Sequence, residues 1–242
     1  MTYRPREFWE QRLQDQFDLR GTGETSMSAA YNAACYTLRR EVLDRALAHA
    51  GADPRGRDVL DVGCGTGFWT AYYTGRGARY TGVDIARTST DRLAAAYPQA
   101  TFLCADVSEA ELPAAYDIVN VFDVLYHITD DARFEAALGR LARAVKPGGL
   151  LLLTDLFADT PGLAEHNRMR SLARYRAVID AQGAFTYAPL VPTHVLLNTH
   201  LGFWRFLNRA PGLLLALDRM LLGSGAGRDD RHNRLLVARR SG

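Results

Sequence analysis

Three glycines spaced two residues apart follow a short apolar segment in the run Val59-Leu60-Asp61-Val62-Gly63-Cys64-Gly65-Thr66-Gly67. Because glycine lacks a Cβ atom, a strand-to-helix turn built on these glycines lets backbone N–H groups approach a bound molecule closely. Turns of this kind hold nucleotide cofactors. The segment therefore predicts a nucleotide-cofactor site, although the glycines alone do not identify the cofactor.

Two more acidic residues follow at the ends of the next two predicted strands. Asp84 ends the segment Arg79–Asp84, where its carboxylate can accept hydrogen bonds from two ribose hydroxyls. Asp106 has the same place one strand later and can accept a hydrogen bond from an adenine amino group. A dinucleotide fingerprint instead reads G-x-G-x-x-G and places a pyrophosphate at a helix N-terminus. The pattern favours a cofactor without a pyrophosphate, and a nicotinamide enzyme is the main alternative.

These motifs resemble those of the class I S-adenosylmethionine-dependent methyltransferases. The family pattern D-x-G-x-G-x-G is matched by Asp61 to Gly67, and the family's strand-two and strand-three acids are matched by Asp84 and Asp106. The resemblance covers about Arg55 to Phe157. It includes a turn at Val145–Gly149 that is typical of members acting on small molecules. Outside that stretch the resemblance weakens.

The resemblance implies S-adenosylmethionine as the cofactor and a role for each matched residue. Asp84 would bind the ribose, Asp106 the adenine edge and the glycine turn the methionine part, with the backbone near Phe122 close to the amino group. Arg39 lies in a segment similar to a pre-motif element of some natural-product members and would pair with the methionine carboxylate. The complete expected cofactor set is Arg39, Asp61, Gly63, Cys64, Gly65, Gly67, Asp84, Ile85, Asp106, Val107 and Phe122, with no metal ligand.

The expected catalytic residue is His127. Methyl transfer from a sulfonium is an in-line displacement, so the protein mainly positions the acceptor and excludes water. An acceptor hydroxyl must also lose its proton, and histidine is a base that titrates near neutral pH. His127 follows the fourth predicted strand, where small-molecule members of the family often carry a histidine. A role in packing or in capping the next helix is the alternative.

Other polar residues compete for roles near the same edge of the sheet. His194 and His200 are expected to be ordinary polar residues at strand ends, with a place in an acceptor pocket as the alternative. Asp123 and Asp155 lie at or just beyond strand ends facing the same cleft. There they can orient a histidine, bind acceptor hydroxyls or cap a helix.

The expected reaction is O-methylation of a small-molecule hydroxyl on an aromatic, polyketide or sugar-like acceptor. N- or C-methylation is the nearest alternative, because a neutral amine needs little help from a base. The fold can also bind the cofactor without methylating, as a cyclase, a decarboxylase or a partner-binding subunit. The acceptor itself is not predicted.

Hydrophobic patterns predict the elements that position these residues. Buried parallel strands are expected at Asp58–Val62, Arg79–Ile85, Thr101–Val107, Tyr116–Leu125 and Leu150–Phe157, with further strands near Phe185–Leu197 and at Arg234–Arg240. One amphipathic helix begins after Thr129 and ends before Lys146-Pro147-Gly148-Gly149, and another spans Ala164–Gln182. This alternation predicts an α/β fold, a doubly wound, mostly parallel seven-stranded Rossmann-like sheet with ligands at the carboxyl ends of its strands.

The 242 residues are expected to form one domain, since no segment resembles a linker. Residues 1–54 would form an N-terminal helical lid, 55–199 the cofactor-binding core, 200–230 a helical insert and 231–242 the last strand. The insert is apolar, but charged residues interrupt it too often for a membrane span. It is expected to pack on the core, with an acceptor-pocket wall or a dimer face as alternatives.

The charge and cysteine content of the chain indicate which binding partners and which cellular compartment to expect. The 29 basic and 27 acidic residues give a formal net charge of +2, so the chain lacks the electrostatic footprint of a protein that binds nucleic acid or an anionic membrane. Cys35, Cys64 and Cys104 are scattered and predict reduced thiols. Residues 1–13 lack the apolar stretch of a secretory signal. We expect a cytoplasmic enzyme with a small-molecule acceptor. The sequence does not decide whether the protein forms a homodimer.

Overall fold

A sheet of eight strands lies at the centre of the computed structural model, which describes residues 3–112, 115–158, 165–197, 202–224 and 232–242. The strand order is β3-β2-β1-β4-β5-β8-β6, with β7 also paired to β8. The strands are β1 (Asp58–Val62), β2 (Arg79–Asp84), β3 (Thr101–Cys104), β4 (Tyr116–Phe122), β5 (Val145–Asp155), β6 (Phe185–Tyr187), β7 (Val191–Pro192) and β8 (Arg234–Arg240). Strands β1 to β5 are parallel, and β8 is antiparallel to β5, β6 and β7. The predicted doubly wound, mostly parallel sheet is confirmed.

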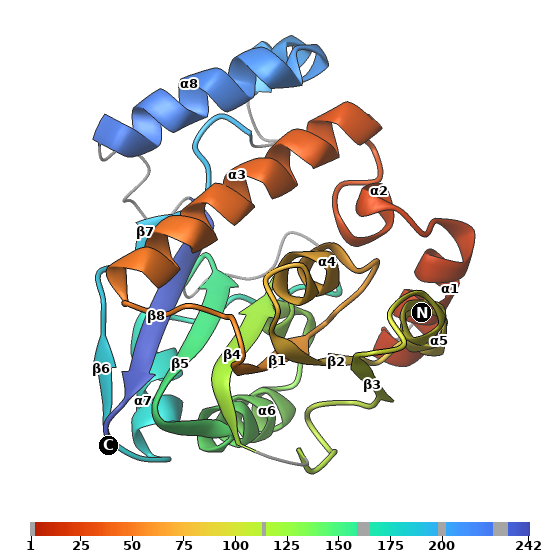
Figure 1. Ribbon diagram of the computed structural model, residues 1–242. Helices are drawn as coiled ribbons and strands as arrows, with labels where there is room; N and C mark the ends of the chain where they lie inside the picture. Colours follow the sequence, from red (N-terminus) through yellow and green to blue (C-terminus); the bar gives the residue numbers. More distant parts are fainter. Residues whose placement is uncertain (1–2, 113–114, 159–164, 198–201, 225–231) are drawn as a thin grey trace.

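Helices cover both faces of the sheet (Figure 1). Because successive residues of a strand point to opposite faces, Val59 and Leu60 of β1 enter different apolar clusters. The cluster of Val59 includes side chains of α3 and α4, and the cluster of Leu60 includes side chains of α6 and α7. The helices are α1 (Pro5–Asp15), α2 (Leu19–Thr22), α3 (Ala29–His49), α4 (Phe68–Thr74), α5 (Arg87–Ala96), α6 (Asp131–Arg143), α7 (Leu172–Asp180) and α8 (Pro211–Ser224), with 3₁₀ turns η1 (Leu125–His127) and η2 (Gly202–Arg209).

Strands β3 and β4 end earlier than the sequence predicts, and the turns that follow them carry the functional candidates. β3 ends at Cys104, so Asp106 lies in the loop beyond the strand. β4 ends at Phe122 because Asp123 has a φ of 60°, a left-handed conformation that cannot continue a strand. His127 then lies in η1, directly after this bend.

The region Phe185–Leu197 differs from the expected single strand. It contains two short strands, β6 and β7, with Pro189, which cannot donate to a ladder, between them. Beyond Pro192, the N–H groups of residues 195–197 donate to the carboxylate of Asp218 in α8 instead of to a neighbouring strand. The sheet therefore has eight strands, not the expected seven.

The helix expected at Ala164–Gln182 is shorter in the structure. Helix α7 begins after Ser171, whose side chain accepts the N–H of Arg174 as an N-cap. Just before this cap, Arg170 is 2% exposed and donates to the carbonyl oxygens of Ile128 and Thr129. These bonds hold the preceding residues against the end of η1 in a non-helical conformation. Ala164 lies outside the described residues.

The segment Val145–Gly149 was expected to be a turn and is the first part of β5. Val145 pairs with Tyr116 of β4, and the register shifts before the next pair, Ile118 with Leu150. Gly148, with a φ of 79°, accommodates this irregularity. Helix α6 ends at Arg143, before this segment, as predicted.

The insert packs on the helical layer. Helix α8 lies along α3 (Figure 1), and Leu214 joins Tyr31 and Leu38 in one apolar cluster. The buried Asp218 carboxylate accepts three backbone N–H groups and so anchors α8 to residues 195–197. Within the described residues, no helix is both long and apolar enough to cross a membrane.

The N-terminal helices are tied to the edge of the sheet where β1 and β2 end. Glu10 of α1 accepts hydrogen bonds from the backbone N and Oγ1 of Thr88, in the first turn of α5 (3.2 and 2.6 Å). Arg12 donates to the carbonyl oxygens of Gly21 and Gly23 (2.6 and 2.7 Å). These bonds hold α1 and α2 beside the loops that follow β1 and β2.

Candidate active site

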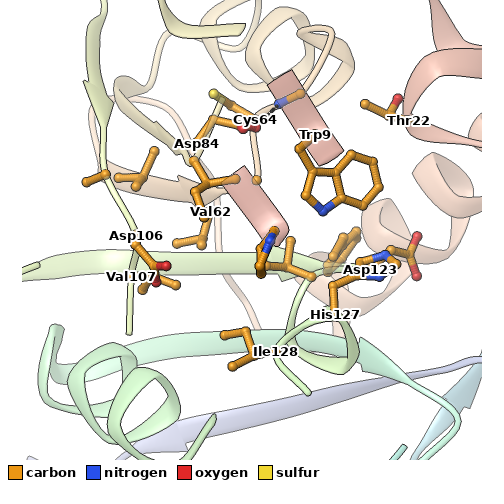
Figure 2. A pocket seen from close by; sticks show the side chains of 18 of the residues that line it. Trp9, Thr22, Val62, Cys64, Asp84, Asp106, Val107, Asp123, His127 and Ile128 are labelled. Atoms are coloured by element: carbon orange, nitrogen blue, oxygen red, sulfur yellow. Dashed lines mark hydrogen bonds between the residues drawn. The ribbon is translucent and has the colours of Figure 1, made fainter. Parts of the chain in front are cut away.

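A cavity of about 290 Å³ lies at the carboxyl ends of β1, β2 and β4, at the lower end of the range for small-molecule sites (roughly 300–1,000 Å³). Residues from α1, α2 and α3 complete its wall. Figure 2 shows Trp9, Thr22, Asp123 and His127 at one end, with Asp84 and Asp106 toward the other. The residues of the predicted site that line it are Gly63, Cys64, Gly65, Asp84, Ile85, Asp106, Val107, Phe122 and His127.

The glycine turn after β1 forms one wall of the cavity. Gly63 and Gly65 have φ angles of 74° and 53°, a region that L side chains rarely adopt. A Cβ atom on Gly63 would also overlap the side chain of Val124, and one on Gly65 would overlap the side chain of Thr22. Glycine is therefore required here by both conformation and close packing. The contact with Thr22 of α2 was not foreseen from the sequence.

Asp84 connects the turns after β1 and β2. Its buried carboxylate accepts the N–H of Gly65 at 2.8 Å and the N–H of Ala86 at 2.9 Å. Burial raises the pKa of Asp84, while these hydrogen bonds lower it. Asp84 also lines the cavity, so its carboxylate lies within reach of a bound molecule. This geometry fits the expected binding of a ribose.

Asp106 is held in place by the side chains of Ser108 and Arg133. Its Oδ1 accepts the backbone N–H and the hydroxyl of Ser108, at 2.9 and 2.6 Å. Its Oδ2 pairs with Arg133 at 2.7 Å, and the same guanidinium reaches Glu109 at 2.9 Å. Arg133, in the first turn of α6, also lines the cavity. Sequence reasoning missed it, because no motif connects a helix surface arginine with the end of β3.

Three predicted cofactor residues lie outside the cavity wall. Gly67 is the N-cap of α4, with a φ of 89°. Asp61 is fully buried under the glycine turn. Its carboxylate accepts hydrogen bonds from the Tyr80 hydroxyl at 2.6 Å and from Asn120 Nδ2 at 2.7 Å. Arg39 pairs with Asp123 at 2.7 Å. In this structure these residues support the wall.

The stability of the protein should depend on pH through Asp61. Burial raises the pKa of Asp61 to about 7, so the folded state favours the protonated carboxyl and loses stability as the pH rises toward and through 7. The Asp61→Asn variant cannot ionise at this position. Between pH 5 and pH 8 the unfolding free energy of the wild type should fall by a few kcal/mol relative to the variant, at up to about 1.4 kcal/mol per pH unit. Urea titrations at each pH measure this difference, and parallel curves would contradict the expectation.

Asp123 combines a left-handed backbone conformation with a carboxylate that is held by three side chains. Besides Arg39, its carboxylate accepts from Asn233 Nδ2 at 2.7 Å and from Thr154 Oγ1 at 3.1 Å. These partners come from α3, from β5 and from the residue before β8. The network holds Asp123 in its left-handed conformation at the cavity wall. The observed role of Asp123 is thus to join four segments at the end of β4.

His127 lines the cavity from η1, with one ring nitrogen engaged. Its Nδ1 lies 3.2 Å from the carbonyl oxygen of His166. A carbonyl oxygen only accepts, so Nδ1 carries the proton and Nε2 keeps a lone pair. The ring stacks on His166 at 5.5 Å and meets the edge of Trp9 at 4.9 Å. Burial lowers the pKa of His127 to about 4, so the imidazole is neutral at pH 7.

The other candidates lie elsewhere. His194 does not line the cavity; its Nδ1 contacts Thr193 Oγ1 at 3.0 Å, and burial lowers its pKa to about 3. His200 lies outside the described residues. Asp155 was expected to face the cleft. Its carboxylate instead accepts a hydrogen bond from the hydroxyl of Tyr175 at 2.5 Å. Across the described ranges, no group of three His, Cys, Asp or Glu side chains gathers closely enough to hold a metal ion.

Comparisons with known proteins find similar sequences and folds. A family model described as a methyltransferase domain matches residues 36–199. A probable S-adenosylmethionine-dependent methyltransferase of Mycolicibacterium smegmatis is 29% identical over 170 residues, or 67% of this chain and 64% of that protein. The malonyl-[acyl-carrier protein] O-methyltransferase of Serratia marcescens is 34% identical over 134 residues, or 55% of this chain and 51% of that protein. The matched segment thus spans less than two thirds of either relative.

A solved structure with the same fold covers almost the whole chain. The magnesium protoporphyrin IX methyltransferase of Synechocystis PCC 6803, crystallised with S-adenosylmethionine, superposes with a TM-score of 0.62 at 20% identity. The match covers 98% of this chain and 95% of that one. At this identity the likeness supports the fold and leaves the substrate open.

Proposed function

This chain belongs to the methyltransferase domain family, and from that premise we propose that it methylates a hydroxyl oxygen of a small molecule with His127 as general base. The cofactor of the family is S-adenosylmethionine, which supplies an electrophilic methyl group on a sulfonium. The observation that carries the proposal is the position of His127, which lines the same cavity as the glycine turn and Asp84.

The cavity wall fits this cofactor. On the cavity wall, Asp84 is an acceptor for the ribose hydroxyls, and Asp106 is an acceptor for the adenine amino group. Gly63 and Gly65 carry no side chains and lie on the cavity wall, so the methionine part can lie against their backbone. Phe122, at the end of β4, brings its backbone to the same wall.

His127 is arranged to take one proton from the acceptor. The Nδ1–H bond to the carbonyl of His166 fixes the ring and leaves Nε2 free to accept. As the new O–CH₃ bond forms and the S–CH₃ bond breaks, the acceptor oxygen becomes more acidic, and its proton passes to Nε2. The low pKa of His127 keeps Nε2 unprotonated before the reaction.

The N-terminal helices are proposed to act as the lid of this site. Trp9 and Leu13 of α1 and Thr22 of α2 line the cavity, so these helices have to separate from the loops after β1 and β2 for ligands to exchange. The bonds of Glu10 to Thr88 are the contacts that such a movement would break.

Incubation with S-adenosylmethionine and a panel of small hydroxyl and amine acceptors tests the proposal. The expected result is S-adenosylhomocysteine formed in step with a mass gain of one methylene on a hydroxyl acceptor. Methylation of amines alone would overturn oxygen as the acceptor atom. Binding of S-adenosylhomocysteine without transfer to any acceptor would indicate a protein that uses the fold for another reaction.

A further inference from the structure

The half of the cavity that contains His127 is walled mainly by rings. We call this half the aromatic end and define it by Trp9 of α1, Tyr36 of α3, Phe68 and Trp69 of α4, and His127. In Figure 2, Trp9 and His127 lie beside each other, away from Asp84 and Asp106. The aromatic end is therefore where an acceptor would approach the base.

Contacts between the rings hold these walls rigidly. Tyr36 packs on Phe68 at 4.7 Å, and Phe68 meets Trp69 edge to face at 4.9 Å. Trp69 in turn meets Phe122, and Trp9 meets His127, both at 4.9 Å. Offset and edge-to-face ring pairs have preferred geometries, so the walls are flat faces and edges in fixed positions. A flat ring can pack against such walls without rearranging them.

Several polar groups at the aromatic end are already paired with one another. The Tyr36 hydroxyl donates to Thr22 Oγ1 at 2.8 Å, and Thr22 Oγ1 lies 3.3 Å from Thr66 Oγ1. The Asp123 carboxylate is engaged by Arg39, Asn233 and Thr154. A ligand rich in hydroxyls would find few free partners here, and each unpaired hydroxyl that it buried would weaken its binding. Nε2 of His127 is left as an acceptor for one hydroxyl, and the hydroxyl of Tyr3, also on the cavity wall, is buried without a hydrogen-bond partner.

The aromatic end also lacks a cation that could hold an anionic group. Within the described part of the cavity wall, Arg133 is the one lysine or arginine, and it is paired with Asp106 and Glu109 at the opposite end. Arg12 stacks over the Trp9 ring at 5.3 Å but donates to backbone carbonyls. Carboxylate or phosphate groups on an acceptor would therefore be buried without a counter-charge.

We propose that the aromatic end binds a neutral, planar aromatic alcohol, with its hydroxyl at Nε2 of His127. The identification of this ligand as the methyl acceptor rests on the proposed function. In the reaction the phenolic oxygen takes the methyl group from the sulfonium of S-adenosylmethionine. The phenolic proton passes to Nε2 of His127. The ring supplies binding through packing, and the single hydroxyl supplies orientation.

Calorimetry with three probes of similar size tests this class on the protein saturated with S-adenosylhomocysteine. We expect 2-naphthol to bind about tenfold more tightly than decahydro-2-naphthol, which has the same skeleton but no aromatic ring. The third probe, 2-naphthoate, carries a negative charge and should bind at least tenfold more weakly than 2-naphthol. Equal affinity for the flat and the saturated alcohol, or preference for the carboxylate, would overturn the proposal.

Two matched variants locate the binding site. Trp9→Leu should weaken 2-naphthol binding roughly tenfold and leave decahydro-2-naphthol binding nearly unchanged. Phe17→Leu is the control, because Phe17 lies outside the cavity wall, under the guanidinium of Arg92 at 4.7 Å. Unchanged affinity for S-adenosylhomocysteine shows that each variant is folded. Equal losses in both variants would contradict a site at Trp9.

Measuring methylation as well as binding distinguishes a failure of the proposed function from a failure of the proposed ligand class. If 2-naphthol binds as expected but is not methylated when S-adenosylmethionine replaces S-adenosylhomocysteine, the aromatic end is correctly identified and the proposed reaction is wrong. If a saturated alcohol is methylated faster than 2-naphthol, the reaction is supported and the planar aromatic ligand is wrong.

Discussion

Replacing Asp84 with alanine is expected to weaken binding of S-adenosylhomocysteine by about 1–3 kcal/mol, or roughly 5- to 150-fold. The change removes the acceptor for the ribose hydroxyls. It also leaves the N–H groups of Gly65 and Ala86 without their observed partner, so the glycine turn loses a support. Both effects act on the same side of the cavity, which makes this the largest expected effect on cofactor binding. Calorimetric titration of the purified variant measures it.

The control for this experiment is Asp91→Ala. Asp91 is exposed on α5, seven residues after Asp84, and does not line the cavity. Its replacement removes the same charge from the protein and should leave the affinity for S-adenosylhomocysteine unchanged. Wild-type affinity in Asp84→Ala would contradict the placement of the ribose, and tight binding of NADH to the wild type would contradict the cofactor.

Replacing His127 with alanine is expected to lower kcat about 10²- to 10⁴-fold, with the affinity for S-adenosylhomocysteine unchanged. The variant loses the acceptor for the hydroxyl proton but keeps the glycine turn, Asp84 and Asp106. Because burial lowers the pKa of His127 to about 4, the base is active in its unprotonated form over most of the pH range. In the wild type, kcat/KM should therefore stay level down to about pH 5 and fall through pH 4 as the imidazole gains a proton.

His49→Ala is the matched control for the His127 variant. His49 is exposed at the end of α3 and lies outside the cavity wall, so its loss should leave kcat unchanged. Nearly full turnover by His127→Ala would exclude this residue as the base and favour an amine acceptor. An acid limb near pH 6.5 would show that His127 is more hydrated during turnover than in the structure.

The positions of the glycine turn and of Asp84 were predictable from local sequence because each is a short motif at a strand end. Gly63 and Gly65 follow β1 directly, and Asp84 is the last residue of β2. In a parallel sheet, neighbouring strands end at the same edge, so motifs separated by tens of residues must meet there. Sequence order and strand direction alone thus bring these groups to one wall.

The positions of Asp61 and Arg39 illustrate what local patterns leave open. Both were expected to touch the cofactor, but side chains on a strand alternate between faces, and Asp61 points to Tyr80 and Asn120 instead of to the cavity. Arg39 lies on a helix whose position over the sheet depends on packing, and that packing places it against Asp123. No local pattern predicts either partner.

Local sequence is enough to predict the order of strands and helices, the glycine turn and the two carboxylates that follow it, because these depend on residue types within a few positions. The surroundings of His127 and the walls of the aromatic end instead depend on how distant segments pack. Trp9, Tyr36 and Phe68 come from three separate helices, and His166 comes from a segment that the sequence predicts as helix. Contacts between distant segments place the proton of His127 on Nδ1 and bury the ring, which lowers the pKa of His127. Such contacts also form the flat walls of the aromatic end. Such contacts depend on how the helices pack, which no pattern within one segment encodes.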